Sequence, residues 1–354
     1  MQLEEIILKI EPIDNTLVEQ AARHTGDLCM PPRALGRLHE IAERLCGITR
    51  SLTPSVQRKA FVVMAGDHGV VKRGVSAFPQ EVTGQMIENF IRGGAGINVL
   101  ARQLSAEIVV VDMGVKTELP SHLERENRFI QRRIASGTDD FTTGPAMTID
   151  QARQAVLTGF EIATSIFQQG VELLGTGDMG IGNTTPSSAI GAVITKKTVD
   201  IMTGRGTGIS DESLQKKCEL IKQGISFNRP DPEDGLDVLA KVGGFEIGGI
   251  AGLVLAGAYH QKPVVIDGLI STAGALIAHR LCPLSSQYAF AGHCSVEPGH
   301  RHMLDHLGLD PIINLELRLG EGTGAALAMH IIEAACRVFN EVSTFSSAGV
   351  STAM

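Results

Sequence analysis

The stretch VELLGTGDMGIGNTTPSSAIGAVI, residues 171–194, runs from a short apolar segment through a glycine-rich turn into a helical pattern. Its first residues predict a buried strand, and we expect the next helix to start at Thr185, with Pro186 in the favoured first position. A strand that passes through a glycine loop into a helix is the repeating unit of parallel α/β sheets. This stretch therefore predicts an α/β fold.

Further short apolar runs close in the same way, with glycine next to Asp, His or Thr. They are residues 59–69, 106–115, 262–271, 287–295 and 312–324. Helical periodicity fills the gaps between them, and Thr148 with Gln151 has the spacing of a capping box. We expect a parallel sheet with helices on both faces, whose glycine loops meet on one rim, where ligands bind in such sheets.

Both ends of the chain show helical patterns. Apolar residues recur at helical spacing in PPRALGRLHEIAERL (residues 31–45) and again in residues 325–338. We infer a small helical unit built from both termini, residues 1–50 and 325–354. It would lie beside an α/β domain of residues 51–324 that carries the active site.

Composition excludes several classes of protein. The 354 residues are 43% apolar and 20% charged, which excludes disordered and collagen-like chains. A net charge of −8 and the absence of Trp argue against nucleic-acid binding. Two early glutamates oppose a secretory signal, no apolar run could cross a bilayer, and the six cysteines lack a C-x-x-C pair. We expect a cytoplasmic protein with reduced thiols and no nucleic-acid or membrane partner.

The first glycine loop allows more than one interpretation. Gly175, Gly177 and Gly180 match G-x-G-x-x-G, with Asp200 further along, which would indicate a dinucleotide-dependent oxidoreductase. However, Asp178 would place a carboxylate beside the pyrophosphate, and the helix starts too late. We therefore favour backbone amides that face a phosphate, while a tight turn without a ligand remains open.

A second glycine loop, TGRGTGISDESLQKK (residues 203–217), precedes a helix that we expect Ser210 to cap. Arginine and lysine side chains lie within the same segment. Flexible amides, a helix N-terminus and cations are what a phosphate cradle needs. A solvent-exposed turn is the simpler alternative.

Two groups that contain histidine have structural explanations. Asp67 and His68 could form a catalytic dyad, but neighbouring residues rarely face each other, so we favour Asp67 as an acceptor for backbone amides of its loop. His302 and His306 have the spacing of helical metal ligands. Because the pattern H-E-x-x-H is absent, we expect no metal.

The sharpest motif is RLGEGTGAALAMHIIEAA (residues 318–335). Glu321 stands there between Gly320 and Gly322, where we expect a strand to end and a helix to begin. A carboxylate in this position can point into the cleft, and the helix N-terminus would help to keep it ionised. Capping of its own helix is the alternative.

Together these motifs resemble the nicotinate-nucleotide:5,6-dimethylbenzimidazole phosphoribosyltransferases. The resemblance covers nearly the full length and runs in order through PPRALGRL, AGDHGV, VSAFPQEVT, GGAGINVLAR, GTGDMGIGNTTPSSA, GRGTG, VGGFEIGGIAG, VIDGLISTAGAL, HCSVEPGH and LRLGEGTGAALA. It implies a Rossmann-like sheet with a small helical domain, a homodimer, and phosphoribosyl transfer from nicotinate mononucleotide to a benzimidazole nitrogen, which gives nicotinate and α-ribazole 5′-phosphate. A nicotinamide-dependent oxidoreductase and a non-catalytic nucleotide- or azole-binding homologue remain as alternatives.

The resemblance also implies a site without a metal or cofactor. Glu321 matches the family's catalytic base, and Asp178 stands where the family has a second glutamate, so that one methylene of reach is lost. We expect Asp178 to support the base. The phosphate and ribose are expected against Gly175, Thr176, Gly177, Gly180, Asn183, Thr184, Gly204, Arg205, Gly206, Gly208, Lys217, Asp267 and Ser295. The benzimidazole is expected against Phe78, Pro79, Thr83, Met86 and Leu317.

Overall fold

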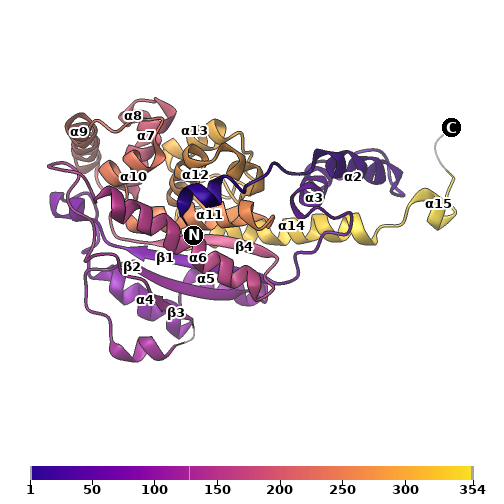
Figure 1. Cartoon of the computed structure of the whole chain (residues 1–354), viewed down its shortest axis with the longest axis horizontal. Coiled ribbons are helices and arrows are strands. Elements are labelled where there is room, and N and C mark those ends of the chain that lie inside the picture. Colours follow the sequence, from indigo (N-terminus) through magenta and orange to yellow (C-terminus); the bar gives the residue numbers. More distant parts are fainter. Residues whose placement is uncertain (1, 127, 352–354) are drawn as a thin grey trace.

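A six-stranded, entirely parallel sheet forms the centre of the computed structural model, which describes the whole chain except residues 1, 127 and 352–354 (Figure 1). The strand order is β3-β2-β1-β4-β5-β6. The strands are β1 (Lys59–Gly66), β2 (Glu107–Gly114), β3 (Phe129–Gln131), β4 (Leu173–Met179), β5 (Val264–Ile266) and β6 (Ala289–Ala291). The predicted α/β fold is confirmed.

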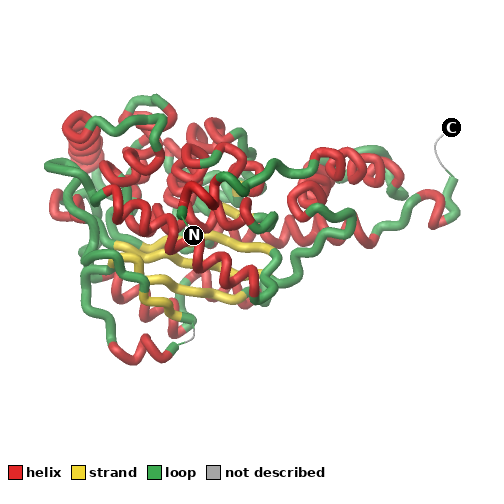
Figure 2. The backbone as a smooth tube through the Cα atoms, viewed as in Figure 1, coloured by secondary structure: helices red, strands yellow, loops and turns green. Residues whose placement is uncertain are grey.

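Helices cover both faces of this sheet (Figure 2). They are α1 (Leu3–Ile7), α2 (Asn15–Asp27), α3 (Arg37–Thr49), α4 (Val82–Arg92), α5 (Gly96–Gln103), α6 (Ile149–Gln168), α7 (Thr184–Thr195), α8 (Val199–Met202), α9 (Asp211–Asn228), α10 (Gly235–Val242), α11 (Phe245–Tyr259), α12 (Leu269–Leu281), α13 (Pro298–Leu307), α14 (Thr323–Glu341) and α15 (Phe345–Ala348). Three short 3-10 helices, η1 (Gly69–Arg73), η2 (Ser121–Arg125) and η3 (Pro283–Tyr288), complete the set.

Successive side chains of a strand point to opposite faces of the sheet, so the contacts of β1 residues show which helix covers which face. Met64 faces α11, where the position of a Cβ on Gly249 would lie 3.0 Å from its sulfur. Phe61 faces the other way, towards Gly322 at the start of α14. The central strands are therefore buried on both faces, as their continuous apolar sequence predicts.

Helices α6 and α11 cross at unusually close range through glycines. A Cβ added to Gly159 would clash with the carbonyl oxygen of Gly249, and one added to Gly252 would clash with that of Val156. The two backbones thus touch where side chains would otherwise separate them. This contact fixes the outer helix α6 to α11, which lies directly on the sheet.

A small helical unit projects from the amino ends of the strands (Figure 1). It consists of α2, α3, the far part of α14, and α15, and α3 packs against both α2 and α14. Segments from the two ends of the chain thus lie side by side. The structure departs from the expected boundaries in two places, because α1 packs against α11 in the α/β body and α14 begins beside the sheet.

Several local expectations can be compared with the structure. The capping box of Thr148 with Gln151 and the cap by Ser210 are confirmed. The strand expected in residues 312–324 is absent from this described segment, apart from a bridge between His293 and Ile313, because Gly320 and its neighbours adopt left-handed backbone angles. The strand β3 was not among the predicted runs.

Helix α7 begins at Thr184, and Pro186 is its third residue instead of its first. In the described part of the chain, no helix is both long and apolar enough to cross a membrane.

Candidate active site

A cavity of about 430 Å³ opens at the carboxyl ends of the strands. Loops that follow β1, β4, β5 and β6 form it, together with the 204–208 loop and the segment before α14. Its lining comprises Phe78, Val82, Met86, Asp178, Met179, Gly180, Ile181, Asn183, Thr184, Gly206, Thr207, Gly268, Leu269, Ile270, His293, Ser295, Glu297, Arg318, Leu319, Gly320 and Glu321. The predicted rim therefore contains both candidate catalytic carboxylates.

Glu321 is buried in this cavity and adopts a left-handed backbone angle, φ +63°. Its Oε2 accepts a hydrogen bond from the backbone N–H of Ile97 at 3.0 Å, near the N-terminus of α5. Burial raises the pKa of Glu321, while the amides of Ile97 and Gly96 oppose the shift. The expectation that the N-terminus of its own helix, α14, would hold this carboxylate was wrong, because the side chain turns towards α5.

Asp178 lies near the end of β4 and is also buried. Its Oδ1 accepts from the Asn183 side-chain amide at 3.0 Å, and its Oδ2 has no hydrogen-bond partner in the described structure. Burial raises the pKa of Asp178 well above its ordinary value, and the carboxylates of Asp267 and Glu246 add to the effect. The raised pKa favours the neutral acid form of Asp178.

Lys217 is a fully buried cation of α9 beside the 204–208 loop. Its Nζ donates to Thr184 Oγ1 at 2.7 Å and to the carbonyl oxygen of Gly204 at 3.3 Å. Burial lowers its pKa to about 8, although the carboxylate of Glu297 opposes the shift. Both of these partners are uncharged. Among the described residues, the ammonium group therefore has no anionic hydrogen-bond partner.

The side wall of the cavity is apolar. Phe78 and Met86 line it as predicted, joined by Leu319. Phe78 and Leu319 are 53% and 62% exposed, so they form an open apolar rim. Of the other expected base-pocket residues, Thr83 is buried behind the wall and accepts from the Ile181 amide at 3.1 Å. Pro79 and Leu317 are not among the lining residues.

Several residues that we expected to touch substrate instead build the frame behind the cavity. Thr176 Oγ1 donates to Ser271 Oγ at 2.9 Å inside the protein. Gly177 packs against the backbone of Glu321, and Gly175 packs against Phe61. These residues of β4 position the segment that carries Glu321 without lining the cavity.

Asp267 is likewise fully buried and serves the frame. Its carboxylate accepts from the amides of Ala325 at 2.9 Å and Gly322 at 3.3 Å, at the N-terminus of α14. Burial raises its pKa, and His293 and the amides oppose the shift. Asp267 thereby fixes the start of α14 directly after Glu321.

The remaining predicted phosphate ligands divide into two groups. Gly180, Asn183, Thr184, Gly206 and Ser295 line the cavity. Gly204, Arg205, Gly208 and Lys217 do not line it. Arg205 pairs with Asp211 on the surface, and Gly204 leaves room for the carboxylate of Glu297.

Asp67 and His68 lie behind the cavity. Asp67 accepts from the amide of Lys116 at 2.8 Å, in agreement with its interpretation as a loop acceptor. His68 Nε2 lies 2.8 Å from the Oε1 atom of Glu246, and both residues are buried. Burial alone would lower the pKa of His68, but the Glu246 carboxylate raises it overall.

Several lining residues were not predicted from sequence. Glu297 accepts a hydrogen bond from the backbone N–H of Gly206 at 2.9 Å. Arg318 and Thr207 also line the cavity, and so does the start of α12. Arg318 was part of the Glu321 motif and could have been found there, whereas the start of α12, residues 268–270, carries no polar side chain that would mark a site.

Comparisons with known proteins agree with this architecture. Residues 10–350 match a family described as phosphoribosyltransferase. The chain is 53% identical over 348 residues, 98% of each chain, to the nicotinate-nucleotide–dimethylbenzimidazole phosphoribosyltransferase of Geotalea uraniireducens (strain Rf4). It is 54% identical over 350 residues, 99% of each chain, to the protein of that name from Desulforamulus reducens.

Solved structures are similar as well. The crystal structure of CobT from Thermus thermophilus aligns with a TM-score of 0.91 and 44% sequence identity. The alignment covers 96% of this chain and 100% of the other.

Proposed function

Since the chain belongs to the family of nicotinate-nucleotide–dimethylbenzimidazole phosphoribosyltransferases, we propose that Glu321 is the base of the reaction that defines this family. The protein transfers the phosphoribosyl group of nicotinate mononucleotide to dimethylbenzimidazole in cobalamin synthesis. The products are nicotinate and α-ribazole 5′-phosphate.

The chemistry requires one proton acceptor. The bond between ribose C1′ and the pyridinium nitrogen breaks, and its electron pair neutralises nicotinate's ring nitrogen. A benzimidazole nitrogen forms the new bond to C1′, which carries oxocarbenium character in the transition state. The second azole nitrogen then becomes acidic and transfers its proton to a carboxylate. Positioned proton removal contributes about 10²- to 10⁴-fold in rate.

The observation that carries this assignment is the environment of Glu321. It is a buried carboxylate in the cavity wall, held by two backbone amides, whose pKa is raised by burial. A carboxylate with a raised pKa accepts a proton more readily, and the amides fix its direction. Leu319, two residues earlier, extends the apolar wall against which a flat azole would lie.

Asp178 supports the base in our proposal. Its Oδ1 lies close to Gly320, where the position of a Cβ would be 3.1 Å away, and its raised pKa favours the neutral acid there. An ionised second carboxylate would raise the pKa of Glu321 further and hinder its role as an anion. A neutral acid keeps the site polar without adding that charge.

We place the phosphate of the mononucleotide at Lys217, Thr184 and Gly206. A buried lysine whose hydrogen-bond partners are uncharged favours binding of an anion, and the Thr184 hydroxyl supplies a further donor. This remote binding energy orients C1′ towards the base.

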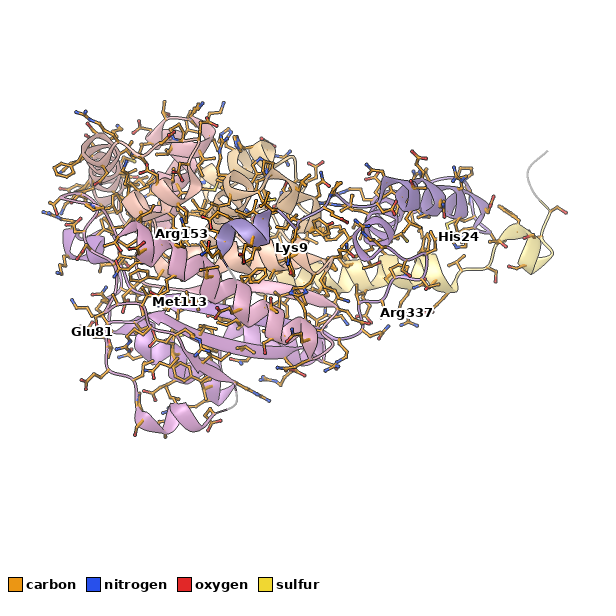
Figure 3. All side chains as sticks on the ribbon, viewed as in Figure 1. Lys9, His24, Glu81, Met113, Arg153 and Arg337 are labelled. Carbon is orange, nitrogen blue, oxygen red and sulfur yellow. The ribbon has the colours of Figure 1, made fainter. Side chains whose placement is uncertain are left out.

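The open apolar rim supports the proposal of a homodimer. Exposed Phe78 and Leu319 leave a flat ligand in contact with water unless another surface covers it. The small helical unit of the same chain lies too far away, because α14 starts at the cavity and its 19 residues extend for about 28 Å. In Figure 3, His24 and Arg337 mark this unit at one end of the molecule, and Glu81, beside the cavity wall, lies at the other. We infer that a second copy supplies the cover.

Location and partners complete the proposal. All six cysteines are unpaired, which is typical of the reducing cytoplasm, where we place the enzyme. The net charge of −8 favours small-molecule substrates over nucleic acid.

The test is incubation of the purified protein with nicotinate mononucleotide and a panel of benzimidazoles, purines and phenols, with mass analysis of the products. We expect α-ribazole 5′-phosphate and an equal amount of nicotinate. Tight NADH binding in a fluorescence titration, without product formation, would contradict the assignment and favour an oxidoreductase.

A further inference from the structure

His300, on α13, is a fully buried histidine behind the active-site cavity. It is not among the lining residues, and the proton transfer described above does not use it. Both of its ring nitrogens nevertheless have partners. Nδ1 accepts from the backbone N–H of Ser295 at 2.8 Å, and Nε2 lies 2.8 Å from the hydroxyl oxygen of Thr272 on α12. The ring thus connects a helix of the α/β body to a segment of the cavity wall.

The Ser295 amide fixes the tautomer of this ring. A backbone N–H can only donate, so Nδ1 carries no proton. In the neutral ring the proton is then on Nε2, which donates to Thr272 Oγ1. Burial lowers the pKa of His300 to about 3, and His293 adds to the shift, so the ring is neutral at pH 7.

The backbone around Ser295 is held from two sides. The amides of Cys294 and Val296 donate to carbonyl oxygens of the segment 313–317, at 3.0 and 3.2 Å. The Ser295 amide between them is bonded to the imidazole of His300 instead. The histidine therefore supplies the anchor that the segment 313–317 does not provide.

This anchored segment carries two residues of the cavity wall, Ser295 and Glu297. Ser295 Oγ accepts from the amide of Glu297 at 3.3 Å, and the carbonyl oxygen of Glu297 accepts from the amide of His300 at 3.0 Å. The side chain and the backbone of His300 thus bond to the two wall residues in turn. A displacement of Ser295 would move Glu297 with it.

Glu297 transmits this restraint to the 204–208 loop. Its Oε1 accepts from the amide of Gly206 at 2.9 Å, and a Cβ on Gly204 would clash with its carboxylate. The carbonyl oxygen of Gly204 in turn accepts from Lys217 Nζ at 3.3 Å. The loop and the lysine at which we place the phosphate are therefore connected to the imidazole through Glu297.

We propose that His300 is a positioning residue for the phosphoribosyl donor: its Nδ1 fixes the 295–297 segment, and through Glu297 the 204–208 loop, in the conformation that binds the phosphate. The argument rests on the proposed function, because it takes a phosphorylated substrate at this loop. The role requires a hydrogen-bond acceptor at the position of Nδ1. It requires neither a charge nor a proton transfer.

Two substitutions of His300 separate the two nitrogens. Asparagine places its side-chain oxygen near the position of Nδ1 and can accept from the Ser295 amide, whereas glutamine reaches the position of Nε2 and keeps the contact with Thr272. Steady-state kinetics of the full-length protein, with each substrate varied in turn, give both KM values. We expect His300→Gln to raise KM for nicotinate mononucleotide by about tenfold, with kcat and KM for the benzimidazole nearly unchanged. His300→Asn should stay within about threefold of wild type.

Thr272→Val is the matched structural control. It removes the other hydrogen bond of the same ring but leaves Nδ1 with the Ser295 amide. We expect a lower melting temperature, with KM for the mononucleotide close to the wild-type value. His306→Gln, at an exposed histidine of the same helix, should leave both KM values unchanged.

Three kinetic results would overturn the proposal. They are an unchanged KM for the mononucleotide in His300→Gln, a rise of equal size for both substrates, and a rise in Thr272→Val as large as that in His300→Gln. The last two would assign the ring to general stability of the fold.

A crystal structure of the wild-type protein with nicotinate mononucleotide keeps the inference testable even if a variant does not fold. The phosphate should lie against the 204–208 loop while the Ser295 amide remains bonded to His300, and a phosphate bound elsewhere would refute the proposal. Failure of the proposed function is a separate result. In that case the wild-type protein would neither bind this mononucleotide nor form a ribazole product.

Discussion

Glu321 is held by backbone amides and not by a charged side chain, so its amide variant can keep the same geometry. In Glu321→Gln the side-chain carbonyl can still accept from Ile97, but the group cannot take a proton. We expect the rate of product formation to fall by about 10²-fold or more, with the circular dichroism spectrum and melting temperature close to wild type.

The pH profile provides the control for this variant. Burial raises the pKa of Glu321, so the acidic limb of the wild-type kcat/KM profile should lie above the ordinary glutamate value, and activity should fall as pH falls through it. The defect of Glu321→Gln should shrink as pH approaches the ionisation of the azole itself. A variant with near-native kcat at neutral pH would show that another group removes the proton.

Lys217 should contribute to binding of the mononucleotide and not of the base. We expect Lys217→Ala to raise KM for nicotinate mononucleotide by at least tenfold and to leave KM for the benzimidazole nearly unchanged. The neighbouring exposed residue permits a matched control, Lys216→Ala, for which both constants should stay at wild-type values.

The pKa of about 8 adds a second readout for this lysine. Above that pH the free enzyme loses the ammonium charge, so KM for the mononucleotide should rise with pH in the wild-type protein and stay flat in Lys217→Ala. Equal effects of Lys217→Ala on both substrates would refute the phosphate assignment.

The raised pKa of Asp178 favours its neutral acid form, and asparagine is the uncharged isostere of that form. We therefore expect Asp178→Asn to lower kcat by less than about tenfold, since the amide resembles the neutral acid. Combined with Glu321→Gln, the loss should be smaller than the product of the two single losses, as for residues that act as a unit. Strictly multiplicative losses would mean that the two residues act independently.

At the scale of elements, the start of α14 depends on one buried carboxylate. Asp267→Ala leaves the amides of Gly322 and Ala325 without their acceptor, at a cost of about 1–3 kcal/mol for each buried group. We expect a lower melting temperature and a lower kcat, because Glu321 directly precedes this turn. Asp267→Asn keeps one acceptor oxygen and should lose less of both, and a fall in stability with an unchanged kcat would show that α14 does not position Glu321.

The sequence revealed the elements that have a strong local signal. Five of the apolar runs contain strands, and the caps at Thr148 and Ser210 form as their side chains predict. The run at residues 312–324 misled us because its leucines alternate like those of a strand, yet Leu315 and Leu319 are exposed and Glu321 takes a left-handed angle. Backbone angles of this kind depend on tertiary contacts.

In the candidate active site as well, the sequence revealed the residues that have a local signal but not the contacts that depend on the packed structure. The motif around Glu321 identified the carboxylate, but its partner, the amide of Ile97, lies 224 residues away in sequence. The same limit explains why Asp267 was expected at the substrate. A carboxylate after a parallel strand predicts a rim position, and only the packed structure shows that backbone amides use both of its oxygens.

At the scale of the whole molecule, the dimer is the central expectation. Sedimentation velocity should show a dimer at assay concentration, and specific activity should fall on dilution as the covering surface dissociates. Sodium chloride at moderate concentration should have little effect on the dimer, since the exposed rim residues Phe78 and Leu319 are apolar. A monomer with full activity at every dilution would contradict this expectation.

The crossing of α6 and α11 has a consequence for inheritance. Any missense change in the codon of Gly159 or Gly252 adds at least one carbon, and at both places that carbon meets a backbone carbonyl oxygen instead of a side chain that could rotate away. No second change at a neighbouring side chain can make room, because the obstacle is the main chain itself. We therefore expect these two codons to accept only synonymous changes. The exposed face of α6, in contrast, can accumulate substitutions.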